Sequence, residues 1–300
     1  MIVALSLSSC SKGTAFDINT PEGREALMDQ VRKHLTAGEC VVAINLIEPL
    51  YDSQYSNSEV RLLRAAAHGC RAGIDFLPLL TQLVGGSLTG SDFYKTLTRI
   101  FPSEEDDQKM ESAWFATDAL MATLKVGTVL DDLFKVNGTT RNPGSMRYWD
   151  RSTDSNMYII FVGMAAMGTT QNRFGEPNSS YVKTVDLPWE THDEMDETGC
   201  AYAGSLVNLL DGIDGVIDGL GTSSFANTLR TIQSDLGGAI TAACTDGCDD
   251  VFDVDTLCDA ATTTCSGCPL KIRNRNTCMS NTVARCAAAG VVRAVNFTWN

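Results

Sequence analysis

Apolar residues recur every three to four positions along the first ninety residues, with polar residues between them, which predicts amphipathic helices. Pro21 suits the first turn of a helix and Gly38 suits its end. Asn57 or Ser58 would cap a later helix that stops at Gly73. The pattern therefore predicts consecutive helices over residues 21–37, 39–51, 59–71 and about 76–83.

The same region contains an internal repeat at an offset of 35 residues. Ala37-Gly38 matches Ala72-Gly73, and Leu27-Met28 matches Leu62-Leu63, so equivalent helix faces recur. Each repeat unit would be a pair of helices.

Helix pairs with a period near 34 residues resemble the tetratricopeptide (TPR) family, whose units are helix–turn–helix motifs. Ala65, Ala66 and Gly69 are small residues where such helices would approach closely. The resemblance covers residues 20–90, about two units, and other residues replace the signature Trp and Tyr. It implies an α-solenoid with a concave surface for peptides or proteins. The alternative is a generic α-helical bundle.

Helical spacing continues beyond Gly90. Met110, Trp114 and Leu120 form one apolar stripe, and residues 157–168 form an apolar run that suits a buried helix. That run is shorter than the roughly 20 residues needed to span a bilayer. Loops are expected at 137–144 and 171–188, and helices at 91–101, 104–125, 157–167, 193–220, 223–243 and 283–289. These expectations describe an all-α fold.

The N-terminus carries Leu7-Ser8-Ser9-Cys10, which resembles a bacterial lipobox. The resemblance implies that residues 1–9 are a signal remnant removed before Cys10, and that Cys10 becomes the acylated, palmitate-bearing N-terminus. Because Ser11 is not Asp, it also implies sorting to the outer membrane. The alternative is that residues 2–7 are a short buried strand or helix end and Cys10 is an ordinary thiol.

The chain has eleven cysteines, and acylation of Cys10 would leave ten, an even number that could form five disulfides in an oxidising compartment. Cys40 lies near the start of one predicted helix and Cys70 near the end of the next, so a bridge between them is geometrically reasonable. The pairing of the other eight stays open. The ten disulfide candidates are Cys40, Cys70, Cys200, Cys244, Cys248, Cys258, Cys265, Cys268, Cys278 and Cys286.

Seven of these cysteines lie between residues 244 and 286, which predicts a disulfide-stapled module over 244–300. A zinc or iron–sulfur site is an alternative, as is a redox dithiol at Cys265 and Cys268. A redox pair normally begins a helix, whereas Pro269 follows this one in a loop-like context. The expected domains are 1–9 (signal), 10–20 (linker), 21–243 (helical) and 244–300 (disulfide module).

The composition of the chain argues against some classes of binding partner. Hydrophobic residues make up 44% of the chain, enough for a sizeable core, and 23 basic against 37 acidic residues give a net charge of −14. This charge argues against nucleic acid and anionic lipid as partners. Membrane attachment would therefore depend on the N-terminal lipid alone.

Motifs of enzymes are missing from the sequence. None of His34, His68 and His192 lies in HExxH or beside GxSxG, and neither GxxxxGK[ST] nor GxGxxG occurs. We expect His34 and His68 to be helix-surface or interface residues. The sequence thus favours a protein without catalytic activity or a cofactor.

Four segments are candidate binding sites. The acid-rich stretch His192–Glu197 and the spaced Asp211, Asp214 and Asp218 could hold a metal, although solvated helix faces explain both, and we expect no metal site. Aspartates among the C-terminal cysteines could bind calcium weakly. Arg147, Trp149 and Arg151 combine guanidinium groups with an aromatic ring beside a loop, which suits an anionic or ring-bearing ligand.

The sequence is therefore interpreted as a lipid-anchored envelope protein at the periplasmic face of the outer membrane, acting as a non-catalytic scaffold for a protein or peptide partner. The alternative function is a ligand-binding accessory lipoprotein of a periplasmic solute transport system, by similarity to TPR lipoproteins associated with TRAP transporters. Both interpretations depend on fold analogy.

Overall fold

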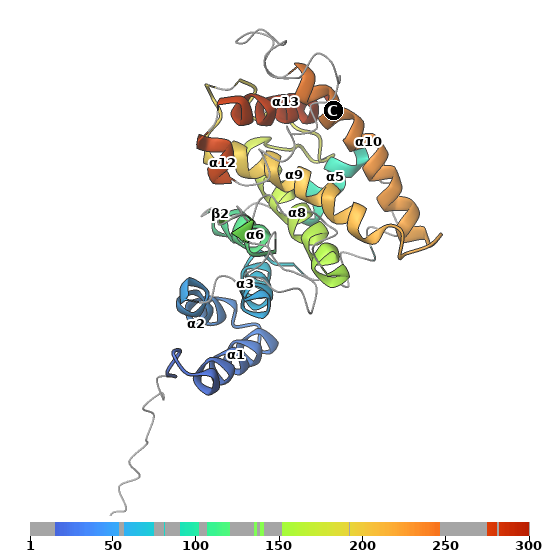
Figure 1. Ribbon diagram of the computed structural model, residues 1–300. Coiled ribbons are helices and arrows are strands. Elements are labelled where there is room, and N and C mark those ends of the chain that lie inside the picture. Colours follow the sequence, from blue (N-terminus) through green and yellow to red (C-terminus); the bar gives the residue numbers. More distant parts are fainter. Residues whose placement is uncertain are drawn as a thin grey trace, which may run out of the picture.

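The computed structural model describes residues 16–53, 57–74, 81, 91–101, 107–120, 135–136, 139–140, 152–191, 193–246, 275–280 and 282–299. Within these residues the fold is all-helical apart from a two-residue antiparallel pairing of β1 (Lys135–Val136) with β2 (Thr139–Thr140). The all-α fold class is confirmed. Figure 1 shows α1 and α2 at one end of the molecule and α10, α12 and α13 at the other.

The helix boundaries near the N-terminus follow the capping residues. α1 (Pro21–Thr36) starts after Thr20, whose hydroxyl accepts a hydrogen bond from Gly23 N, and α3 (Ser58–Arg71) starts after Asn57, whose carboxamide accepts from two backbone N–H groups. Gly38 follows α1 with a φ of +73°, a conformation that favours glycine. α2 (Cys40–Ser53) begins directly afterwards.

α1, α2 and α3 form an N-terminal unit with its own small core. Each helix buries one apolar face against the other two, and the core residues are Leu27, Met28, Val31, Ala43, Ile47, Leu50, Val60, Leu63 and Ala67. The helix expected at 76–83 lies outside the described residues, except that Thr81 is helical. Stacking of repeated helix pairs as in TPR proteins therefore stays a prediction.

The larger part of the molecule, here called the main body, is built around α8 (Thr153–Phe174) and α9 (Glu197–Val216). These two helices are buried on nearly all sides. α5 (Ser91–Ile100) covers α8, and α10 (Ser224–Asp246), α12 (Arg275–Ser280) and α13 (Thr282–Thr298) pack around α9. One continuous core connects them.

α6 (Gln108–Leu120) joins the two parts, because it packs against α3 on one side and α8 on the other. Small residues allow the close approach: Ala65 of α3 and Ala116 and Ala119 of α6 are fully buried there. The Tyr158 hydroxyl of α8 donates to the Ala65 carbonyl at 3.2 Å and adds a direct link from the main body to α3.

Several expected boundaries change. α8 continues to Phe174 through the start of the loop expected at 171–188, because Thr169, Thr170 and Gln171 are buried in the core. α13 is much longer than the expected helix at 283–289, and α12 was not expected.

The domain boundary expected after residue 243 does not separate the described C-terminal helices from the rest. Side chains of α13 such as Ala288, Val292 and Val295, together with Trp299, share the core of α8 and α9. Among the described helices, none has the length and apolar character to cross a membrane.

Candidate functional site

Two buried arrangements of charged side chains are candidate sites. One is a charged seam between α2, α3 and α6, and the other is a small pocket between α6, α9 and α12. We define the charged seam as Glu48 of α2 with Arg61, Arg64 and His68 of α3. Residues 61, 64 and 68 share one helix face because they are three and four positions apart.

Glu48 is the centre of the charged seam. Arg64 Nε lies 2.9 and 3.1 Å from the two carboxylate oxygens, and His68 Nε2 lies 2.7 Å from Oε1. Since a carboxylate only accepts, Nε2 carries the proton and donates it. Burial acts to raise the pKa of Glu48, but the hydrogen bonds from His68 and Arg64 and the Arg64 charge outweigh it and lower that pKa.

The surroundings of His68 favour its neutral form. Burial is the main cause of its lowered pKa, the neighbouring Arg64 charge lowers it further, and the bond to Glu48 opposes both. Nδ1 of His68 is buried and has no hydrogen-bond partner within the described residues. A proton on Nδ1 would therefore be an unsatisfied buried donor beside a guanidinium group.

The two arginines connect α3 to α6. Arg61 Nη1 donates to the Ala119 carbonyl at 3.3 Å, and Arg64 Nη1 donates to the Phe115 carbonyl at 3.2 Å. The Arg64 guanidinium also lies 4.2 Å from the centre of the Tyr51 ring, a cation–π contact. The charged seam therefore fixes how the N-terminal unit sits on the main body.

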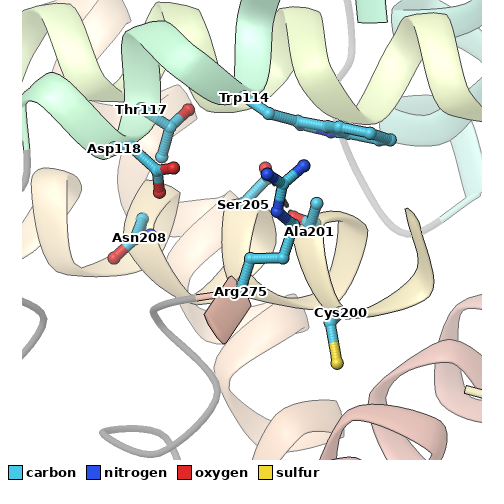
Figure 2. Close-up of a pocket in the computed structure, with 9 residues that line it drawn as sticks. Trp114, Thr117, Asp118, Cys200, Ala201, Ser205, Asn208 and Arg275 are labelled. Carbon is cyan, nitrogen blue, oxygen red and sulfur yellow. Dashed lines mark hydrogen bonds between the residues drawn. The ribbon is translucent and has the colours of Figure 1, made fainter. Parts of the chain in front are cut away.

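The pocket is bordered by Trp114, Thr117 and Asp118 of α6, by Cys200, Ala201, Gly204, Ser205 and Asn208 of α9, and by Arg275 of α12. Figure 2 shows the Arg275 side chain reaching from α12 toward the space between α6 and α9. The free volume is about 10 Å³, room for about one water molecule. Organic ligands do not fit this volume.

Asp118 and Arg275 give the pocket its charge. Burial raises the pKa of Asp118, while the positive charges of Arg275, Arg64 and Arg61 oppose that rise. Arg275 Nη1 also lies 3.8 Å from Glu197 Oε2 at the start of α9, and its guanidinium is 5.9 Å from the Phe115 ring centre. Arg275 thus ties α12 to both α6 and α9.

Two disulfides are present among the residues that the structure describes. Cys40 and Cys70 are bonded, which confirms the expected bridge between the start of α2 and the end of α3. Cys200 of α9 is bonded to Cys278 of α12, one of the pairings that the sequence left open.

Cys286 corrects the expectation that all ten cysteines pair. It is a free, fully buried thiol in α13, where its side chain is enclosed by the helix packing. With Cys286 free, the ten candidate cysteines do not form five disulfides. Cys244 belongs to α10, but its side chain and the whole of Cys248, Cys258, Cys265 and Cys268 lie outside the described residues.

The structure describes only some of the remaining predicted site residues. Cys10 and the set Arg147, Trp149 and Arg151 lie outside the described residues, as does His192. His34 bonds to Glu39 at the end of α1, and His68 lies in an interface, as expected. In the part of the chain that the structure describes, no three side chains of the metal-binding types come together.

Sequence reasoning missed both the charged seam and the pocket. Arg61 and Arg64 alternate with apolar residues in α3, so the signal for the charged seam was present as two arginines on a largely buried helix. The pocket combines three segments that are distant in the sequence, and no local pattern indicates it.

Comparisons with known proteins give no relative: no protein-family model, curated protein or solved structure matches the chain.

Proposed function

We propose that this protein is a lipid-anchored component of a bacterial cell envelope and that its N-terminal unit is a scaffold for a protein or peptide partner. The observation that carries the proposal is the combination of the lipobox-like Leu7–Cys10 segment with two disulfides. Disulfides persist in oxidising compartments such as the periplasm and are rare in the cytosol.

The position of the N-terminal unit supports a role in binding. At most about 40 Å of chain separates Cys10 from Pro21, so an acylated Cys10 would hold α1 close to the membrane surface. α2 exposes two neighbouring valines at its start, Val41 and Val42, with Val42 42% exposed. Apolar side chains exposed together are typical of contact surfaces.

The anchor is tested by intact mass spectrometry of the full chain expressed in a Gram-negative host. We expect a triacylated species that starts at Cys10, and we expect Cys10→Ala to leave the membrane fraction. The variant still contains the Cys40–Cys70 and Cys200–Cys278 bonds. Loss of membrane attachment without loss of folding would therefore show that the lipid on Cys10 holds the protein at the membrane. A membrane-bound Cys10→Ala protein, or a mature chain that keeps Met1, contradicts the anchor.

The scaffold role is tested by a photo-crosslinking residue at position 42, with position 181 as the matched control. Tyr181 is 39% exposed but lies in the loop after α8, on the main body. We expect one defined cross-linked envelope protein from position 42 and none from position 181. Equal labelling at both positions contradicts a binding surface on α2, and a captured periplasmic solute-binding protein favours the transport-accessory function.

A further inference from the structure

Trp114 presents an unusual buried donor. Its side chain is only 6% exposed, and its Nε1–H has no acceptor within the described residues. A buried donor without a partner costs about 1 to 3 kcal/mol, and native proteins rarely leave one unsatisfied. A tryptophan at this position therefore requires an acceptor that the protein chain described here does not supply.

The same indole borders the pocket between α6, α9 and α12. The hydroxyl hydrogens of two other bordering residues are already used inside their own helices: Thr117 donates to the Ala113 carbonyl at 3.0 Å and Ser205 to the Ala201 carbonyl at 2.8 Å. Their oxygens and the Asp118 carboxylate remain as acceptors. The pocket thus offers one unused indole donor, the Arg275 guanidinium, and several acceptors around a space of about 10 Å³.

We propose that this pocket binds one ordered water molecule, which accepts a hydrogen bond from Trp114 Nε1–H and donates to Asp118. A water molecule suits the site because it needs about this volume and two to four polar partners. It would satisfy the indole and link α6 to the helices that carry Ser205 and Arg275.

Water fits the pocket better than an anion of similar size. A halide ion would also accept hydrogen bonds from Trp114 and Arg275. The Asp118 carboxylate borders the same small space, however, and its negative charge would repel the halide. Water can accept from the indole and donate to the carboxylate at the same time.

The wall formed by α12 favours slow exchange of the bound water. Arg275 and Cys278 lie three residues apart on α12, and Cys278 is bonded to Cys200, which itself borders the pocket. The disulfide therefore holds α12, which carries Arg275, against α9 at the edge of the pocket.

The first test is a crystal structure of the full chain at a resolution that shows ordered water. We expect one density peak 2.7 to 3.2 Å from Trp114 Nε1, at normal hydrogen-bond distance. A structure in which Nε1 donates directly to a protein atom, or faces an empty pocket, overturns the proposal. An anomalous peak at this position after a bromide soak also overturns it, in favour of an anion.

A solution test uses Trp114→Phe, which keeps an aromatic ring and removes the N–H, with Asp118→Asn as a control that keeps an acceptor oxygen. Magnetic relaxation dispersion of water counts long-lived internal water molecules. We expect a loss of about one such molecule in Trp114→Phe and none in Asp118→Asn. An unchanged count in a folded Trp114→Phe protein contradicts the indole's role. If Trp114→Phe does not fold, the crystal structure of the unmodified chain decides alone.

Discussion

Helices pack differently in the N-terminal unit and in the main body. In the N-terminal unit, three helices share a small core; α1 and α2 keep polar faces in solvent, whereas α3 is largely buried because its other side packs on α6. In the main body, α8 and α9 bury most of their residues in a much larger core. Each region contains one disulfide, but the small core also depends on charges at its border with α6, whereas the large core depends on close contact between helices.

The two disulfides are the first way to test this difference, and their removal has the largest expected effect. In the chain-entropy model, loss of Cys40–Cys70, separated by 30 residues, costs about 3 to 4 kcal/mol, and loss of Cys200–Cys278, separated by 78, costs about 4 to 5 kcal/mol. We would measure urea unfolding of the two double alanine variants, with amide hydrogen exchange to locate the change.

Hydrogen exchange distinguishes the two regions. We expect Cys40→Ala/Cys70→Ala to increase exchange in α1–α3 while α8 and α9 stay protected, because the bridge links α2 to α3 and the core that these helices share is small. Equal loss of protection throughout the molecule would show that the two regions unfold as one unit.

Close helix packing in the main body is tested at Gly212 of α9. A Cβ atom there would lie 2.5 Å from Ile159 Cγ2 and 2.9 Å from the Asn156 carbonyl oxygen of α8. We expect Gly212→Val to destabilise the protein by about 3 kcal/mol, because neither neighbour can move without separating the helices. Thermal unfolding would measure the effect.

Gly237 of α10 provides the matched control, since a Cβ atom at that position meets nothing within 4 Å. Gly237→Ala should raise stability by about 0.5 to 1 kcal/mol through helix propensity. A comparable destabilisation at both glycines would mean that α8 and α9 are not closely packed.

The charged seam is tested by removing the charge of Glu48. We expect Glu48→Gln to cost about 2 kcal/mol, because it leaves the buried Arg64 without its counter-charge. Glu59→Gln is the control: Glu59 pairs with Arg32 in solvent, and loss of that pair should cost about 0.5 kcal/mol or less. Urea unfolding of both variants would compare their losses of unfolding free energy. Equal losses would contradict a specific role for the charged seam.

The smallest expected effect is a pH dependence from His68. Its folded pKa is below the ordinary value of 6.5, so the unfolded chain binds a proton that the folded chain does not, and stability falls as the pH drops below about 6.5. The loss between pH 6.5 and 5.5 is expected to be at most about 1 kcal/mol. His68→Gln should flatten the unfolding free energy over this range, and a parallel pH profile in the variant would refute the assignment.

Local signals in the sequence predicted the local features. Pro21, Asn57 and Gly38 mark helix ends by their own chemistry, so the N-terminal helices were placed within one or two residues. The Cys40–Cys70 bond followed because both cysteines lie at the same end of a predicted helix pair.

Features that join distant segments were not predictable in this way. The contact between Arg64 and Glu48 depends on how two helices cross, and the pocket depends on Arg275 meeting Asp118 across more than half the chain. The pairing of Cys200 was one of many possibilities, and the burial of Cys286 depends on the packing of α13. These facts follow from tertiary packing alone.

The bond between Cys40 and Cys70 has a mechanical consequence. A force applied to the chain before residue 40 passes through the sulfur–sulfur bridge to residue 70, so α2 and most of α3 carry no load. In a single-molecule stretching experiment the intact bridge would hide about 100 Å of contour length, which reduction would release. Under tension from the N-terminal side, the face of α2 with Val41 and Val42 would keep its shape while α1 is pulled straight.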